Sequence, residues 1–149
     1  MKKILSVISN SEAETEKTGA RLASGLKKGD VVALYGPVGA GKTSFVRGVA
    51  GGFGREASVK SPSFTLVNEY PGDPVLYHID FYRLESEREI VDLGWTEYLN
   101  GESVVVIEWA EKVRKMLPSG RFDVYFEILG LGIRRLEVFA GDDSGDRQF

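Results

Sequence analysis

A run of eight residues, 36–43, carries the clearest chemical signal in this chain. It reads Gly-Pro-Val-Gly-Ala-Gly-Lys-Thr, with three glycines followed by a lysine and a threonine. Glycine lets the backbone turn sharply and approach a bound group closely, so that successive amide groups can surround an anion. A lysine and a threonine hydroxyl directly after such a loop suit a phosphate chain and its metal ion. The pattern therefore predicts a phosphate-binding loop (P-loop).

The segments on either side of this loop have the character that a P-loop requires. Residues 31–35 are apolar without alternation, as in a strand that is buried on both faces, and residues 42–50 suit a helix. The alternative, a flexible glycine turn without a ligand, does not account for these flanks. We expect the loop to bind ATP or ADP together with Mg²⁺. The residues expected to contact the nucleotide are Gly36, Pro37, Val38, Gly39, Ala40, Gly41, Lys42, Thr43 and Ser44.

Two acidic residues end apolar segments elsewhere in the chain. Asp80 follows residues 75–79, and Glu108 follows residues 103–107. Ligands of an open α/β sheet bind at the carboxyl ends of its strands, so both carboxylates are placed to reach the terminal phosphate. Each acid could instead only cap or solvate the end of its strand. Because hydrolysis needs a carboxylate for the metal and a group that holds water, we favour functional roles and expect Asp80, Glu108 and Lys42 to be catalytic.

Three neighbouring features allow two interpretations each. His78, the only histidine, could tune Asp80 or a bound water, or it could be an ordinary hydrogen-bonded histidine of a sheet. Trp109 could be a core residue or a contact near the nucleotide. Residues 61–65, which read Ser-Pro-Ser-Phe-Thr, could sense the γ-phosphate as a switch segment or form an ordinary loop.

The rest of the sequence indicates the elements that must position these residues. Ser11 and Glu14 form a capping-box pattern at the start of a helix that runs to about residue 26. Further helices are expected at residues 42–50, 85–92 and 110–116. Strands are expected at residues 4–9, 31–35, 64–70, 75–80, 103–107, 122–128 and 136–138. This order predicts an α/β fold, a P-loop NTPase-like three-layer sandwich with a mixed, partly parallel sheet and a C-terminal antiparallel hairpin.

Length and composition fit one globular domain. The chain has 149 residues, 42% of them hydrophobic and 28% charged, and we expect a single domain over residues 1–140 and a flexible tail over residues 141–149. The absence of cysteine excludes disulfides and thiolate metal sites. The apolar start at residues 4–8 is too short for a signal peptide and nothing approaches a membrane span, so a cytoplasmic protein is expected. With a net charge of −3, any role in nucleic-acid chemistry is expected to act through a partner.

Several blocks of the sequence together resemble one known family. They read G-x-x-G-A-G-K-T-S-F-V-R-G, S-P-S-F-T-L-V-N-E-Y, Y-H-I-D-F-Y-R-L, L-G-W-T-E-Y-L and V-I-E-W-A-E-K, and an L-P pair follows them. In this order, over about residues 15–118, they resemble the TsaE (YjeE) family, the ATPases of bacterial tRNA threonylcarbamoyladenosine biosynthesis. The resemblance implies a P-loop domain that works with two partners, TsaD and TsaB, and reaches tRNA only indirectly through that complex.

The resemblance also implies roles for single residues. It assigns Lys42 and Thr43 to the phosphates and Mg²⁺, Glu108 to the metal side, and Asp80 to the catalytic or switch side. It makes residues 61–65 the switch segment. Because it places the N-terminal segment and the C-terminal hairpin near the adenine, it suggests two base contacts. These are Thr15 and Arg135.

The chain departs from the family pattern at two positions. Pro37 stands where the family usually has an acid, which removes a charge and an amide from the loop. Ser63 stands where the family usually has threonine and keeps the hydroxyl. The implied function is an ATPase that is weak alone, is stimulated by its partners, and resets or switches the TsaD–TsaB complex. A small P-loop kinase and a nucleotide-dependent clamp without turnover are the alternatives.

Overall fold

The computed structural model describes residues 1–55, 66–141, 147 and 149. The elements of this part follow the order expected from the sequence. They are β1 (Lys2–Ser9), α1 (Glu12–Ala23), β2 (Val31–Tyr35), α2 (Lys42–Gly52), β3 (Val67–Tyr70), β4 (Leu76–Asp80), α3 (Glu87–Asp92), the 3₁₀ helix η1 (Trp95–Tyr98), β5 (Val104–Glu108), the 3₁₀ helix η2 (Ala110–Met116), β6 (Phe122–Gly130) and β7 (Ile133–Ala140).

The described strands form one seven-stranded sheet in the order β1-β7-β6-β2-β5-β4-β3. The strand β2 pairs in parallel with both β5 and β6, and β5 pairs in parallel with β4. Towards the two sides of the sheet the pairing becomes antiparallel, between β1, β7 and β6 and between β3 and β4. This arrangement confirms the predicted mixed sheet with its C-terminal hairpin. It also brings the carboxyl ends of β2, β5 and β4 together at one end of the sheet.

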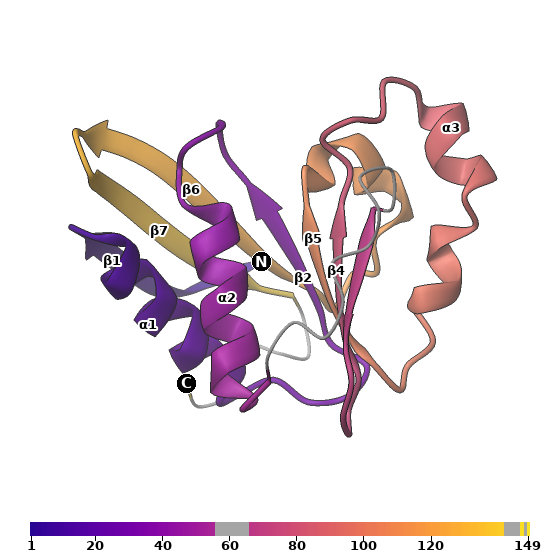
Figure 1. Ribbon diagram of the computed structural model, residues 1–149, viewed down its shortest axis with the longest axis horizontal. Coiled ribbons are helices and arrows are strands. Elements are labelled where there is room, and N and C mark those ends of the chain that lie inside the picture. The colour runs from indigo at the N-terminus through magenta and orange to yellow at the C-terminus, as the bar shows by residue number, and fades with distance from the viewer. Residues whose placement is uncertain (56–65, 142–146, 148) are drawn as a thin grey trace.

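Helices cover both faces of the sheet. The helices α1 and α2 lie side by side over one face (Figure 1), and α3, η1 and η2 pack on the other. The side chains of β2 alternate between the two cores: Val32 and Leu34 pack under α1 and α2, whereas Ala33 and Tyr35 pack on the opposite side. A strand between two cores carries apolar residues at every position, which explains its unbroken apolar sequence. The three-layer prediction is confirmed.

Close packing of α1 against α2 sets the position of the P-loop helix. A side chain on Gly48 of α2 would overlap the backbone oxygen of Glu16, and one on Gly19 of α1 would overlap that of Phe45. Glycine at both positions therefore lets the two helix backbones touch. Because α2 begins at Lys42, this contact also fixes where the P-loop ends.

The start of α1 follows the expected capping pattern, and its end differs from the prediction. The Ser11 side chain accepts a hydrogen bond from the Glu14 amide at 3.1 Å, while the Glu14 carboxylate accepts one from the Asn10 amide. The helix ends at Ala23 and not near residue 26, because the chain turns at Gly25, whose amide donates to the Leu22 carbonyl.

Other boundaries differ from the expectation by a few residues. The helix α2 continues to Gly52, α3 begins at Glu87, and β3 begins at Val67. The helical segment expected at residues 110–116 is a 3₁₀ helix that is broken at Val113, where φ is −126°. The expected switch segment at residues 61–65 lies outside the described residues.

Of the flexible tail expected at residues 141–149, the structure describes Gly141, Arg147 and Phe149, and the last two contact the domain. The Arg147 guanidinium pairs with the Asp30 carboxylate. The Phe149 ring meets the Phe122 ring edge to face, with 5.5 Å between the ring centroids. These contacts connect the last residues to the core under α1.

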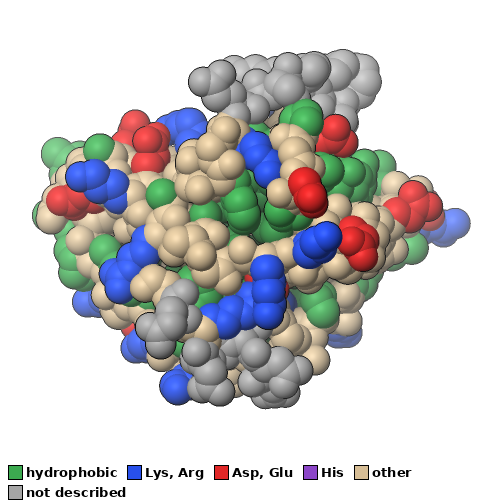
Figure 2. All heavy atoms as spheres, turned by 90° about the horizontal axis from the view of Figure 1, so that it is seen from below, with side chains coloured by type: hydrophobic (Ala, Val, Ile, Leu, Met, Phe, Trp, Pro, Cys, Tyr) green, Lys and Arg blue, Asp and Glu red, His purple; other side chains and the backbone are tan. Residues whose placement is uncertain are grey.

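The described surface seen from below carries a mixture of acidic, basic and hydrophobic side chains (Figure 2). Within the described ranges, no helix is long and apolar enough to span a membrane.

Candidate nucleotide site

The P-loop connects the end of β2 to the first turn of α2. Gly36, Gly39 and Gly41 have φ angles of 151°, 82° and 98°, which lie in the region that favours glycine. A side chain at Gly36 would also overlap Phe126, since an added Cβ would lie 2.8 Å from its Cβ. The loop conformation thus requires these glycines, and it ends at the N-terminus of a helix, where free amides favour an anion.

The tip of the loop is formed by Pro37 and Val38, which are exposed. The Ala40 amide donates to the Pro37 carbonyl at 3.2 Å and closes a turn, while the Ala40 side chain is buried. Because proline lacks an amide hydrogen, Pro37 offers no donor to a phosphate.

A pocket of about 420 Å³ opens at this loop. Its walls come from the P-loop, α2, the ends of β4 and β5, the start of α1, and β7. The lining residues are Glu12, Val38, Gly39, Gly41, Lys42, Thr43, Ser44, Arg47, Asp80, Tyr82, Glu108, Trp109 and Arg134. The pocket thus brings together most of the expected P-loop contacts and both expected acids, whereas Gly36, Pro37 and Ala40 lie outside its lining.

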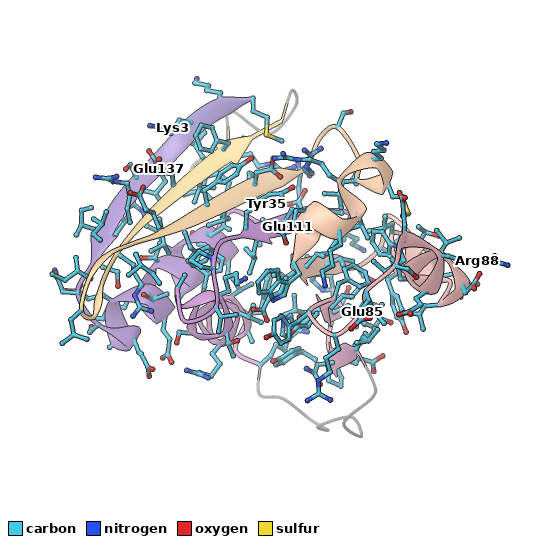
Figure 3. The ribbon with its side chains drawn as sticks, turned by 90° about the horizontal axis from the view of Figure 1, so that it is seen from above. Lys3, Tyr35, Glu85, Arg88, Glu111 and Glu137 are labelled. Carbon is cyan, nitrogen blue, oxygen red and sulfur yellow. The ribbon has the colours of Figure 1, made fainter. Side chains whose placement is uncertain are left out.

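Seen from the P-loop end of the molecule, Tyr35 at the end of β2 lies near Glu111 of η2 (Figure 3). Glu85 and Arg88, which belong to the segment around α3, lie farther out in the same view.

Lys42 is buried and points back toward the loop. Its Nζ donates to the Gly36 carbonyl at 2.6 Å and lies 3.7 Å from the centroid of the Trp109 ring. Burial lowers the pKa of the Lys42 ammonium, and the nearby carboxylates, Glu108 first, act in the opposite direction. Because the Lys42 ammonium is buried, an anion that enters the pocket would form a favourable charge-assisted hydrogen bond with it.

The two acids lie next to each other at the ends of neighbouring strands. Asp80 of β4 is directly opposite Glu108 of β5, and Glu108 is opposite Leu34 of β2. Glu108 is 3% exposed, and its Oε2 lies 2.6 Å from Nε2 of His78. The Asp80 carboxylate is less buried and accepts a hydrogen bond from the Tyr82 amide at 2.9 Å. Of the two interpretations of His78, the structure thus shows a hydrogen-bonded histidine of the sheet, and its partner is Glu108 and not Asp80.

Aromatic side chains form one wall of the pocket. The rings of Tyr82 and Trp109 are tilted at 40° with centroids 5.1 Å apart. Within the described residues, Trp109 is the only non-glycine residue with a positive φ, at 59°. Such a conformation costs about 1–2 kcal/mol and is often found at functional sites. Of the two interpretations of Trp109, its place in the pocket favours the one near the nucleotide.

The loop that follows Asp80 is fastened to η2 by Lys112. The ammonium group donates to three backbone carbonyls, those of Phe81 at 3.0 Å, Tyr82 at 3.0 Å and Leu84 at 2.7 Å. These three acceptors match the three donors of an ammonium group. Lys112 therefore helps to position the strand end that carries Asp80.

The two suggested base contacts lie outside the pocket lining. The Thr15 hydroxyl is fully buried and hydrogen-bonded to that of Ser9 at 2.7 Å. Arg135 forms an ion pair with Glu127 at 3.2 Å. Their neighbours line the pocket instead: Glu12 from the exposed first turn of α1, and Arg134 from β7, where successive side chains point to opposite faces.

Sequence reasoning missed Tyr82, Glu12, Arg47 and Arg134. Tyr82 could have been suspected from its place two residues after Asp80. For Arg134 the available signal was the alternation of Leu136 and Val138, which puts Arg134 and not Arg135 on the core side of that strand.

The donors in the pocket fit Mg²⁺ bound together with a nucleotide. They are the exposed Thr43 hydroxyl and the carboxylates of Glu108 and Asp80. In the part of the chain that the structure describes, no group of three or more His, Cys, Asp or Glu side chains could hold a metal by itself. In proteins, Mg²⁺ usually binds one or two carboxylates and takes its other oxygens from phosphates and water.

Comparison with known proteins indicates the family of this chain. The family model described as threonylcarbamoyl adenosine biosynthesis protein TsaE matches residues 9–134. The tRNA threonylcarbamoyladenosine biosynthesis protein TsaE of Treponema pallidum is 40% identical over 131 residues, which is 88% of this chain and 97% of that protein. The TsaE protein of Rickettsia conorii is 43% identical over 141 residues, 93% of this chain and 80% of that protein.

A solved structure is similar as well. The crystal structure of YdiB from Bacillus subtilis superimposes with a TM-score of 0.77 and 31% sequence identity, and the match covers 96% of this chain and 90% of that one. The resemblance seen in the sequence blocks is thus confirmed over most of the chain, and the protein belongs to the TsaE family of tRNA threonylcarbamoyladenosine biosynthesis proteins.

Proposed function

We propose that this protein binds Mg–ATP in the P-loop pocket and hydrolyses it to serve tRNA threonylcarbamoyladenosine synthesis. The observation that carries the proposal is the meeting of three groups in one pocket. The Lys42 ammonium and the carboxylates of Asp80 and Glu108 all line it, beside a helix N-terminus. A P-loop hydrolase needs a cation for the phosphates, a metal-side carboxylate and a group that holds water.

Each residue has a role that follows from its position. The amides at the start of α2 bind the phosphates, and Lys42 exchanges the Gly36 carbonyl for a phosphate oxygen. Thr43 and Glu108 would hold Mg²⁺, which would offset negative charge on the phosphates. Asp80 lies beside Glu108 and orients the attacking water. The Tyr82 and Trp109 rings restrict the access of other water to this end of the pocket.

We further propose that the output of hydrolysis is a change in a partner complex. A TsaD-like and a TsaB-like protein are the proposed partners, with tRNA reached only through them, in the cytoplasm. The net charge of −3 supports indirect contact, because direct binding to a tRNA backbone usually relies on a basic excess. Activity alone is expected to be weak.

Phosphate release from ATP, measured for the protein alone and with TsaD and TsaB added, tests this proposal. The expected result is slow release alone and faster release with both partners. Nucleotide binding without any release in either condition would favour the clamp. Transfer of the γ-phosphate to a small metabolite would favour a kinase.

A further inference from the structure

The single histidine of the chain contacts one of the two acids and not the other. His78 lies on β4 opposite Val106 of β5, so Glu108, two residues later, is its diagonal neighbour on the same face of the sheet. The His78 Nε2 and the Glu108 Oε2 are 2.6 Å apart. His78 is 7% exposed and Glu108 is 3% exposed, so little water competes for this hydrogen bond.

The chemistry of the pair defines which atom donates. A carboxylate that binds Mg²⁺ is ionised and can only accept a hydrogen bond, so for that role of Glu108 the Nε2 of His78 must be the donor. A glutamate side chain can rotate about three bonds, so fixing it in the one orientation that binds a ligand costs conformational entropy. His78 lies on β4, which is held between β3 and β5, and its imidazole restricts this rotation by binding Oε2 of Glu108. Oε1 of Glu108 is then the oxygen that remains for a ligand in the pocket.

We propose that His78 is a positioning residue, which orients the Glu108 carboxylate toward the Mg²⁺ of a bound nucleotide. This inference rests on the proposed function, since it deepens the role given there to Glu108. The two acids differ in how they are held: Asp80 by the backbone amide of Tyr82, and Glu108 by the side chain of His78. A substitution at His78 therefore acts on the metal side of the pocket and leaves the anchor of Asp80 in place.

Two substitutions at this position separate the hydrogen bond from simple packing. His78→Gln places an amide nitrogen near the position of Nε2 and keeps a donor, whereas His78→Leu removes it. The affinity for ADP is measured calorimetrically for each variant, once with Mg²⁺ and once with a chelator. Mg²⁺ should increase the affinity of the wild type for ADP, and in His78→Leu we expect this increase to be about ten- to hundredfold smaller. That is the effect expected when one hydrogen bond to a charged group is lost. In the chelator the affinity of His78→Leu should match that of the wild type, and His78→Gln should retain most of the increase.

A merely structural role would give a different pattern. It would lower the affinity of His78→Leu equally with and without Mg²⁺, or affect both variants alike, and either result would overturn the proposal. The same measurement in a Glu108→Ala background adds a second check. There His78→Leu should have no further effect on the Mg²⁺ dependence, and a full additional loss would also contradict the proposal.

These binding experiments do not require hydrolysis. A wild-type protein that binds Mg–ADP but never releases phosphate would refute the proposed ATPase and still allow the variants to decide the role of His78. Conversely, normal hydrolysis with an unchanged Mg²⁺ dependence in His78→Leu would refute only the positioning role.

Discussion

The Lys42 ammonium lies 3.7 Å from the centroid of the Trp109 indole ring while it donates to the Gly36 carbonyl. Lys42 belongs to the first turn of α2, and Trp109 directly follows β5. The lysine that is proposed to bind the phosphates is thus held by an aromatic ring and a backbone carbonyl before the ligand arrives. Both interactions can be exchanged for contacts with a nucleotide without a change in the fold.

Lys42→Ala should weaken ATP binding about ten- to hundredfold, because it removes at least one charge-assisted hydrogen bond of roughly 1.5–3 kcal/mol. Calorimetric titration measures the affinity, and the unfolding transition shows whether the fold is intact. Unchanged ATP affinity in a folded variant would falsify the role of Lys42.

The same contact predicts a spectroscopic signal. Displacement of the Lys42 ammonium from the indole should change the fluorescence of Trp109 when ATP binds. The other tryptophan, Trp95, is buried in the second core and should respond little. Titration of ATP against the wild type and Trp109→Phe tests this, and an equal change of emission in both would contradict it.

Glu108 and Asp80 should affect different steps. Glu108→Ala should reduce the Mg²⁺ dependence of ATP binding, since it removes a metal-side carboxylate. Asp80→Ala should leave binding nearly unchanged and mainly slow phosphate release. Glu108→Gln is the control: it removes the charge but keeps an oxygen that can accept the hydrogen bond from His78, so it separates the loss of the carboxylate from the loss of the buried pair. Identical Mg²⁺ dependence in the two alanine variants would argue against this division.

Gly48→Ala should destabilise the protein by about 1–3 kcal/mol, because the new methyl group would overlap the Glu16 backbone and force α1 and α2 apart. Gly51→Ala in the same helix is the matched control. Among the described residues, no atom outside the adjoining backbone of the helix lies within 4 Å of a Cβ added there, so alanine should stabilise the helix by about 0.5–1 kcal/mol. Chemical denaturation measures both, and a similar effect of the two substitutions would exclude the packing argument.

Lys112→Met should lower the free energy of unfolding by about 1–3 kcal/mol, because three backbone carbonyls lose their charged donor. Lys115→Met is the control, since Lys115 is exposed and should change stability by less than about 0.5 kcal/mol. Equal stability of the two variants would mean that water replaces the ammonium group at no cost.

The proposed switch predicts that partner binding depends on the nucleotide. A ligand shifts an equilibrium only by its different affinity for the two states, so ATP and ADP must support binding to TsaD and TsaB to different extents. The affinity is measured with ADP, with a non-hydrolysable ATP analogue and without nucleotide. Equal values in all three conditions would rule out the switch.

The P-loop, the class of the fold and the two strand-end acids could be predicted from local sequence patterns. The P-loop is contiguous, so its glycines, Lys42 and Thr43 are recognisable without any knowledge of distant contacts. The strand β2 could be predicted because burial on both faces leaves an unbroken apolar run. Asp80 and Glu108 were identified because each follows such a run directly.

How these parts meet could not be predicted from the sequence, because it depends on strand order and packing. The pairing of β4 with β5 places Asp80 opposite Glu108 and His78 within reach of Glu108, and strand order is not encoded in any local pattern. Arg134 lies on the same face of β7 as Leu136 and Val138, which pack in the core under α1 and α2, whereas Arg135 lies on the opposite face. The position of that face next to the P-loop follows from the place of β7 in the sheet, which no local pattern encodes. Arg134, and not Arg135, therefore lines the nucleotide pocket.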